Sequence, residues 1–192
     1  MRSFTCLTWN IEGFHSNVTS LAYFLETFNP DMVFLSEPKL FQHDLLLATN
    51  MLRGSFSYSL NSEDLIDIDR AISAKQAHGG IMILWKAAYD SFITARSINS
   101  TAFLPIIFSP PQLPTSVHVA VYLPTAGKEG SFVEELAKLT IFIQNIKTEF
   151  PDCLVFLRGD FNVSNTNAKR LPVLNHFCNT LGLSRVNIQH PT

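Results

Sequence analysis

Two acidic residues directly follow apolar segments of this chain, and polar neighbours accompany both. Asp160 lies two residues before Asn162 and follows the apolar run 153–157. Glu37 follows a second apolar run at 32–35, and both runs have the pattern of buried strands. A carboxylate and a carboxamide at a strand end can together hold a water and a phosphate oxygen. The pattern therefore predicts one shared acidic, metal-binding site.

Two further motifs lie just past apolar strands: Thr8-Trp9-Asn10 and Tyr122-Leu123-Pro124. Taken singly, each polar residue has an ordinary structural interpretation. Asn10 could cap a turn, Glu37 could be a solvated strand end, Tyr122 could pack in the core, and Asp160 with Asn162 could form an Asx-turn. Sites in sheet proteins gather outside strand ends, so the joint pattern favours a common site.

Phosphodiester hydrolysis is the chemistry that these residue types suit. The reaction needs a hard cation beside the phosphate, an oriented water for in-line attack and donors for the growing negative charge. Carboxylate and carboxamide oxygens suit Mg²⁺, with Mn²⁺ as the alternative cation. Carboxylates, two carboxamides and a phenol supply much of what is needed.

Strands and helices alternate along the sequence, which predicts an α/β fold. A first series of strand, helix and acid-ending strand spans 4–37, and a weak echo of it spans 117–160. The expected strands are 4–10, 32–36, 54–60, 81–85, fragments within 90–116, 117–123, 153–158 and 184–188. Two helices are expected to begin at Ser16 or Asn17 and at the capping box Ser131–Glu134. Two more are expected at 41–52 and at 168–181, and Gly182 is expected to end the last one. Residues 61–78 are polar and read as a loop.

Composition indicates one domain, 1–192, with 46% hydrophobic residues for its core. The net charge of −2 gives no overall basic field. Three cysteines, Cys6, Cys153 and Cys178, have no metal-like spacing and are expected as buried free thiols. Without a leader pattern or a run of about 18 apolar residues, the sequence predicts an intracellular protein, cytoplasmic or nuclear, that is not secreted and has no membrane partner.

The order of the motifs resembles the endonuclease/exonuclease/phosphatase superfamily: Trp-Asn, Glu, Gly-Gly-x-x-x-Leu, Tyr-x-Pro and Gly-Asp-Phe-Asn. Within it, the chain is most similar to the apurinic-type endonuclease domain of non-LTR (LINE-type) retrotransposons. Gly79–Leu84 and the tail His190-Pro191-Thr192 support this, and the resemblance spans 4–192. It implies a DNase I-like, four-layer α/β sandwich of two mixed, mostly antiparallel sheets flanked by helices.

The resemblance also implies roles for the five candidate catalytic residues. Glu37 matches the metal-binding glutamate, and Asn10 matches its companion at the metal and phosphate. Tyr122 matches the tyrosine that contacts the scissile phosphate. Asp160 matches the aspartate that orients or deprotonates the attacking water, and Asn162 matches the asparagine that helps hold that water.

Four further residues are candidates for substrate binding. Lys39, Lys128 and Arg158 are basic residues near the motifs and could contact phosphate, with a solvated role as the alternative for each. Thr192 and the loop 61–78 could contact DNA, by analogy with the family alone.

The chain departs from the family pattern in two places and ends before the last family motif. Ser36 replaces the usual Asn or Gln before the metal glutamate, and Ala120 replaces an Asn two residues before the tyrosine. The family continues past the region of Thr192 with strands that carry an aspartate and a Ser-Asp-His motif. We therefore expect an incomplete domain with low stability and weak activity.

The leading functional prediction is an Mg²⁺-dependent endonuclease that nicks DNA by in-line water attack, as in retrotransposon target-site cleavage. A reverse transcriptase domain would then follow in a full-length parent. One alternative is another phosphoesterase of the superfamily, acting on abasic DNA, RNA or phosphoinositides. The other is an inactive truncated relic or interaction domain.

Overall fold

The computed structural model describes residues 4–41, 44, 48, 50, 52, 55–61 and 77–186. The chain forms two compact units. The first unit is made by the chain up to Leu123 together with Asp152–Phe161, and the second by Pro124–Pro151 together with the chain from Asn162 onward. All the described strands belong to the first unit.

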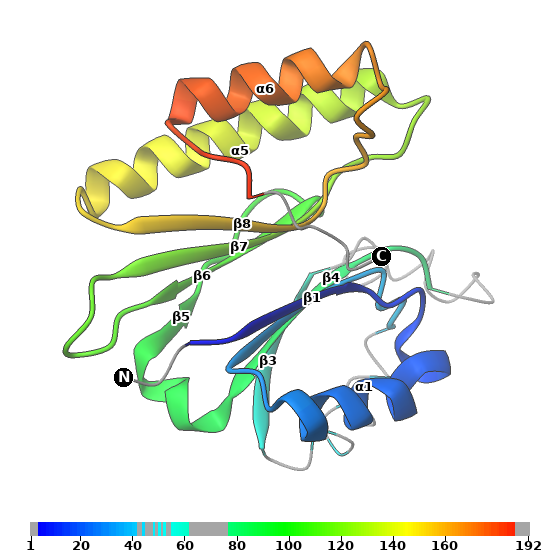
Figure 1. Ribbon diagram of the computed structural model, residues 1–192, viewed down its shortest axis with the longest axis vertical. Helices are drawn as coiled ribbons and strands as arrows, with labels where there is room; N and C mark the ends of the chain where they lie inside the picture. The colour runs from blue at the N-terminus through cyan, green and yellow to red at the C-terminus, as the bar shows by residue number, and fades with distance from the viewer. Residues whose placement is uncertain are drawn as a thin grey trace. The chain divides into compact units, whose positions relative to one another are not determined.

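Two four-stranded sheets build the first unit (Figure 1). One has the order β1 (Cys6–Asn10), β2 (Met32–Ser36), β4 (Ile81–Lys86), β3 (Phe56–Asn61). The other has the order β5 (Ile93–Ala95), β6 (Phe103–Phe108), β7 (Ser116–Tyr122), β8 (Leu154–Asp160). In each sheet one edge pair is parallel, β1 with β2 and β7 with β8, and the other pairs are antiparallel. A 3₁₀ helix, η2 (Ala87–Phe92), connects β4 to β5.

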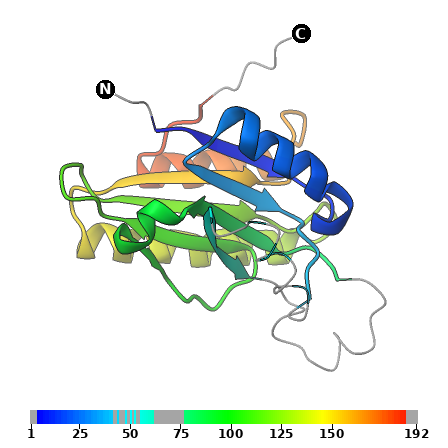
Figure 2. The same ribbon diagram turned by 90° about the horizontal axis from the view of Figure 1, so that it is seen from below.

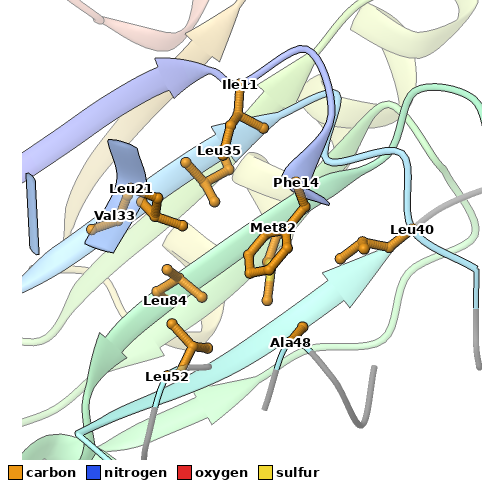
Figure 3. Close-up of a cluster of buried hydrophobic side chains, with 10 residues drawn as sticks. All are labelled: Ile11, Phe14, Leu21, Val33, Leu35, Leu40, Ala48, Leu52, Met82 and Leu84. Atoms are coloured by element: carbon orange, nitrogen blue, oxygen red, sulfur yellow. The ribbon is translucent and has the colours of Figure 1, made fainter. Parts of the chain in front are cut away.

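The strand β2 is buried on both faces and so joins two cores. Val33 and Leu35 pack with residues of helix α1 (Phe14–Phe28), which lies over the outer face of its sheet (Figures 1 and 2). Figure 3 shows this cluster, in which Met82 and Leu84 of β4 meet the same helix face. The alternate residues of β2 and β4 pack instead against β6 and β7, between the two sheets. The period-2 alternation of strand side chains therefore places one core on each side of the first sheet.

The predicted echo between 4–37 and 117–160 corresponds to a repeated topology. In each sheet, two parallel strands are neighbours in space and are separated in sequence by a long helix, α1 between β1 and β2, and α5 (Glu129–Glu149) between β7 and β8. The carboxyl ends of each parallel pair thus lie together, Asn10 beside Ser36 and Tyr122 beside Asp160. The predicted α/β class with two mixed, mostly antiparallel sheets is confirmed.

The second unit contains two helices that run parallel, α5 and α6 (Arg170–Leu181). Near their first turns the Arg170 guanidinium lies over the Phe132 ring, and at their last turns Lys147 Nζ donates to the Leu181 carbonyl at 2.7 Å. The apolar residues Leu136, Leu139, Ile143 and Ile146 of α5 are buried. Gly182 ends α6 in the left-handed conformation, as predicted.

The predicted starts of helices α1 and α5 are wrong. Helix α1 begins at Phe14 after Gly13, without a side-chain cap, and Asn17 donates instead to the Ile11 carbonyl at 2.8 Å. Helix α5 begins at Glu129, so Ser131 lies inside its first turn and forms no capping box. In each case the chain is already helical before the residue that could have capped it.

Some predictions fall partly or wholly outside the described residues. The helix at 41–52 and the loop at 61–78 lie mostly outside them. Of the strand expected at 184–188, residues 184–186 are described and are not strand. The three cysteines are free, as predicted, but partly exposed rather than buried. Among the residues described here, no helix is long and apolar enough to cross a membrane.

Candidate active site

The carboxyl ends of the two parallel strand pairs meet at the Glu37 carboxylate. Glu37 directly follows β2, and its Oε1 accepts hydrogen bonds from Asn10 Nδ2 at 3.1 Å and from the Tyr122 hydroxyl at 2.9 Å. Asn10 is the last residue of β1, and Tyr122 is the last residue of β7 in the other sheet. Three residues that the sequence predicts for one site are therefore brought together by three strand ends.

Lys39 completes the surroundings of the same carboxylate. Its Nζ lies 3.2 Å from Glu37 Oε2, so both carboxylate oxygens have a donor. Burial alone would raise the pKa of Glu37, but the hydrogen bonds from Asn10, Tyr122 and Lys39 and the charge of Lys39 together hold the pKa below its usual range. Glu37 is thus a carboxylate, ready to bind a cation.

The backbone around Glu37 is fixed by hydrogen bonds on two sides. The amides of Glu37 and Lys39 donate to the carbonyls of Gly80 and Gly79, each at 3.0 Å, and the Gly13 amide donates to the Glu37 carbonyl at 2.9 Å. Glu37 and Lys39 both have left-handed backbones, with φ of 54° and 51°. Such conformations cost free energy and persist only where the surroundings enforce them, typically at functional sites.

Tyr122 is held as a neutral hydrogen-bond donor. Burial, the hydrogen bond to Glu37 and the negative charges of Glu37 and Asp160 all raise the pKa of its phenol. A phenol that keeps its proton can move this single hydrogen bond from Glu37 to another anion, such as a phosphate oxygen, when one enters the site.

Asp160 is the last residue of β8 and pairs in register with Tyr122. Its carbonyl accepts a hydrogen bond from the Leu123 amide at 3.0 Å, which fixes the strand end. Gly159, directly before it, has a φ of 136°, and a Cβ there would overlap the Val121 carbonyl. Only glycine allows β8 to approach β7 this closely, so the Gly-Asp pair places the carboxylate beside Tyr122.

Two predicted residues belong to the second unit. Asn162 has a left-handed backbone with φ of 51°, and its carbonyl accepts a hydrogen bond from Arg170 at 3.3 Å. Lys128 is exposed and directly precedes α5. Thr192 lies outside the described residues.

Arg158 is partly buried and contacts residues of both sheets. Its guanidinium is 5.1 Å from the Phe34 ring centroid and 4.8 Å from that of Phe156, and NH1 lies 2.7 Å from His118 Nδ1. Burial, followed by the Arg158 charge, lowers the pKa of His118 to about 3, so this ring is neutral and its Nδ1 accepts from Arg158. Its Nε2 then donates to Ser116 Oγ at 3.0 Å. These contacts favour a structural role for Arg158 over the phosphate contact that we expected.

The donor set at Glu37 is compatible with a magnesium site that is completed by substrate. Within the described ranges, no group of three His, Cys, Asp or Glu side chains could hold a metal alone. Mg²⁺, however, is commonly bound through one or two carboxylates, with waters and substrate phosphates as the remaining ligands. Glu37 provides the carboxylate, and Asn10 Oδ1, which accepts the Glu12 amide at 3.3 Å, provides a neighbouring oxygen.

Sequence reasoning did not find the backbone clamp around Glu37. In the sequence, the Gly79-Gly80 pair was identified only as part of the Gly-Gly-x-x-x-Leu motif. Both glycines have positive φ, and their carbonyls point to the Glu37 loop. A glycine pair between a loop and a buried strand is the signal that could have identified it.

Comparison with solved structures identifies proteins that share this fold. The 3′ phosphatase NExo from Neisseria, bound to a product DNA hairpin, matches with a TM-score of 0.59 at 16% identity over 86% of this chain and 60% of its own. The AP endonuclease LMAP from Leishmania major matches with a TM-score of 0.66 at 16% identity, over 85% of this chain and 56% of its own. TDP2 from D. rerio, complexed with a single-strand DNA product, matches with a TM-score of 0.54 at 15% identity, over 94% and 65%.

The family itself is shown by sequence. The model of the Endonuclease/Exonuclease/phosphatase family matches residues 7–180, and the chain belongs to this family. A search of curated proteins found no match. The chain spans 56–65% of the length of the three solved proteins named above.

Proposed function

We propose that this protein is a metal-dependent phosphodiesterase that nicks DNA by in-line attack of water. The observation that carries the proposal is that the Glu37 carboxylate accepts hydrogen bonds from Asn10 and Tyr122 where strands of both sheets end. Asp160, in register with Tyr122, adds a second carboxylate to the same end of the sheets. This arrangement supplies a cation ligand, a phosphate donor and a group that can hold water.

Glu37 and Asn10 would hold the divalent cation, for which Mg²⁺ is the best match to oxygen donors. When bound, the cation supplies neutralisation of charge on the phosphate. The Tyr122 hydroxyl, 2.9 Å from Glu37, would donate to a phosphate oxygen next to that cation. Lys39, whose ammonium now neutralises Glu37 Oε2, would be released toward the phosphate when the cation replaces it.

The Asp160 carboxylate would orient the attacking water and accept its proton. A base in this role must be fixed, and the close approach of β8 to β7 at Gly159 fixes the strand that carries it. Asn162, two residues further along the chain, is proposed to hold the same water and a phosphate oxygen. Removing a group of this kind typically lowers the rate by about two to four powers of ten.

The assignment to a retrotransposon parent rests on the resemblance alone. We propose DNA as substrate, an intracellular location and a LINE-type retrotransposon parent with a downstream reverse transcriptase. Support for DNA comes from similar folds: NExo and TDP2 were solved with DNA products. The alternative is hydrolysis of another phosphate ester, which the 3′ phosphatase activity named for NExo favours.

A plasmid-nicking assay tests the proposal directly. Supercoiled plasmid is incubated with the chain and Mg²⁺, Mn²⁺ or EDTA, alongside Glu37→Gln and Asp160→Asn. Asp152→Asn is the matched control, because Asp152 is an exposed aspartate at the opposite end of β8. We expect metal-dependent nicking that both site variants abolish and the control retains. Equal nicking by all variants, or none by the folded wild type, would refute a nuclease. In the second case a 3′-phosphate oligonucleotide would test the alternative.

A further inference from the structure

Arg170, at the start of α6, is among the largest fully buried side chains of the molecule and is 1% exposed. Its NH1 donates to the carbonyls of Pro124 and Asn162, and its NH2 donates to the Thr125 carbonyl at 2.6 Å. The guanidinium lies 4.5 Å from the Phe132 ring centroid. One buried cation therefore binds three backbone carbonyls from two separate chain segments, all within the second unit.

These two segments are the continuations of the two strands that carry the candidate site. Pro124 and Thr125 follow Tyr122 by two and three residues, and Asn162 follows Asp160 by two. Arg170 thus joins the chain leaving β7 to the chain leaving β8 directly after their site residues.

We infer that Arg170 is a positioning residue that fixes the backbone of Asn162, and with it the orientation of the Asn162 carboxamide, for the hydrolysis reaction. This inference rests on the proposed function. A guanidinium is suited to the task because its planar, rigid fork presents five donors in fixed directions. A lysine ammonium at the same place keeps the charge, but it is a compact point charge without that planar geometry.

The charge of Arg170 is only partly balanced by another side chain. Its Nε is 3.5 Å from Glu129 Oε1 and has no hydrogen-bond partner, and Glu129 is about half exposed. Buried charges are costly unless they are paired and fully hydrogen-bonded. The guanidinium is therefore stabilised mainly by its carbonyl contacts, and one of these is to Asn162, whose backbone is left-handed.

A purely structural arginine would make the same contacts, so the test must separate the two roles. A double-mutant cycle does this, because a residue that acts through Asn162 loses its effect once the carboxamide is gone. The variants are Arg170→Lys, Asn162→Ala and the double variant. Lys147→Met is the matched control, since it removes another cation-to-carbonyl contact from the same unit.

We expect Arg170→Lys to lower kcat by about 10- to 100-fold with KM changed less than about threefold, as misplacement of a reacting group does. In the Asn162→Ala background the same substitution should lower kcat less than about threefold. Lys147→Met should leave kcat unchanged. An equal loss in both backgrounds would assign Arg170 a structural role only and overturn the inference.

Hydrogen exchange measured by mass spectrometry gives a second readout that needs no activity. Arg170→Lys should speed exchange in peptides covering 161–168 and 124–129 and leave the α5 interior at 136–146 unchanged. Lys147→Met should leave 161–168 unchanged. Unchanged exchange at 161–168 in a folded Arg170→Lys would overturn the inference even in an inactive protein. Failure of the proposed function itself would appear instead as a wild type without metal-dependent hydrolysis.

Discussion

Replacing Tyr122 with Phe removes one oxygen atom and isolates the role of the phenol. In the structure this hydroxyl donates to Glu37 Oε1 at 2.9 Å and stays protonated because its pKa is raised. If the hydroxyl transfers this hydrogen bond to the phosphate during the reaction, its loss should cost what other transition-state donors cost, about 3–4 kcal/mol or 10²- to 10³-fold in kcat. Substrate binding should change much less.

The stability cost of the same substitution should be small. Hydrogen bonds to charged groups contribute about 1.5–3 kcal/mol, and the lower end applies because the Glu37 carboxylate keeps Asn10 at 3.1 Å and Lys39 at 3.2 Å. Phenylalanine leaves no unpaired donor behind. We therefore expect Tyr122→Phe to lower the free energy of unfolding by about 1.5 kcal/mol, as measured by urea denaturation.

A matched control is Tyr89→Phe. The Tyr89 hydroxyl donates to Asp31 Oδ1 at 2.8 Å, and Asp31 keeps Lys86 at 3.1 Å and the Thr5 amide at 2.8 Å. The two substitutions thus remove the same kind of bond from a carboxylate that keeps other partners. They should cost similar stability, whereas only Tyr122→Phe should lower kcat. Equal effects on kcat, or no effect of Tyr122→Phe beyond its stability loss, would refute the assigned role.

Three further predictions concern the framework. His118 is 3% exposed and its pKa is lowered to about 3, so below about pH 6.5 the unfolded state takes up a proton that the folded state does not, and the free energy of unfolding should fall by up to about 5 kcal/mol between pH 6.5 and 3. Denaturation measured across pH 4.5–6.5 should therefore show a flatter dependence of this free energy on pH for His118→Gln, but not for the exposed His176→Gln. Gly159→Ala should lower the free energy of unfolding by more than about 3 kcal/mol through steric overlap, whereas Gly130→Ala, with open space around its Cβ, should raise it by up to about 1 kcal/mol. Equal melting temperatures of the two variants would contradict the close approach of the strands. Asp31→Asn should lower the free energy of unfolding, measured in urea, by about 3 kcal/mol because Asp31 is buried in an ion pair. It should leave kcat unchanged because Asp31 lies at the opposite end of β2 from the site, and a fall in kcat would count against that separation.

The parts of the fold that the sequence predicted are those with a strong local signal. The strand 32–36 is correct to the residue, because five consecutive apolar or small residues between Asp31 and Glu37 suit only a strand buried on both faces. The grouping of Asn10, Glu37 and Tyr122 followed from one rule, that polar residues after parallel strands gather at the same edge. Three strand ends were identifiable, and their meeting point was therefore predictable.

The parts that the sequence did not predict depend on partners that are distant in sequence. Arg158 lies in a strand pattern and carries a charge, which suggested an exposed residue near phosphate. In the structure its guanidinium donates to the His118 ring and lies over two aromatic faces, and no local sequence pattern reveals these contacts. The helix starts failed for a related reason. Helix α1 begins directly after Gly13, whose amide donates to the Glu37 carbonyl, so the loop rather than a side-chain cap sets the start.

The hydrogen bonds that hold the Glu37 loop are also contacts of the fold, so the surrounding strands stabilise the strained backbone of Glu37. The Glu37 loop bonds through its backbone to the Gly79-Gly80 segment and to the start of α1, and through its side chain to Asn10 and Tyr122. A left-handed glutamate would be unstable alone, but neighbours on three sides fix it, so its free-energy cost is met by strands buried on both faces. A carboxylate held by this many contacts needs little reorganisation when a cation binds, and preorganisation of this kind stabilises the charge that develops in a transition state.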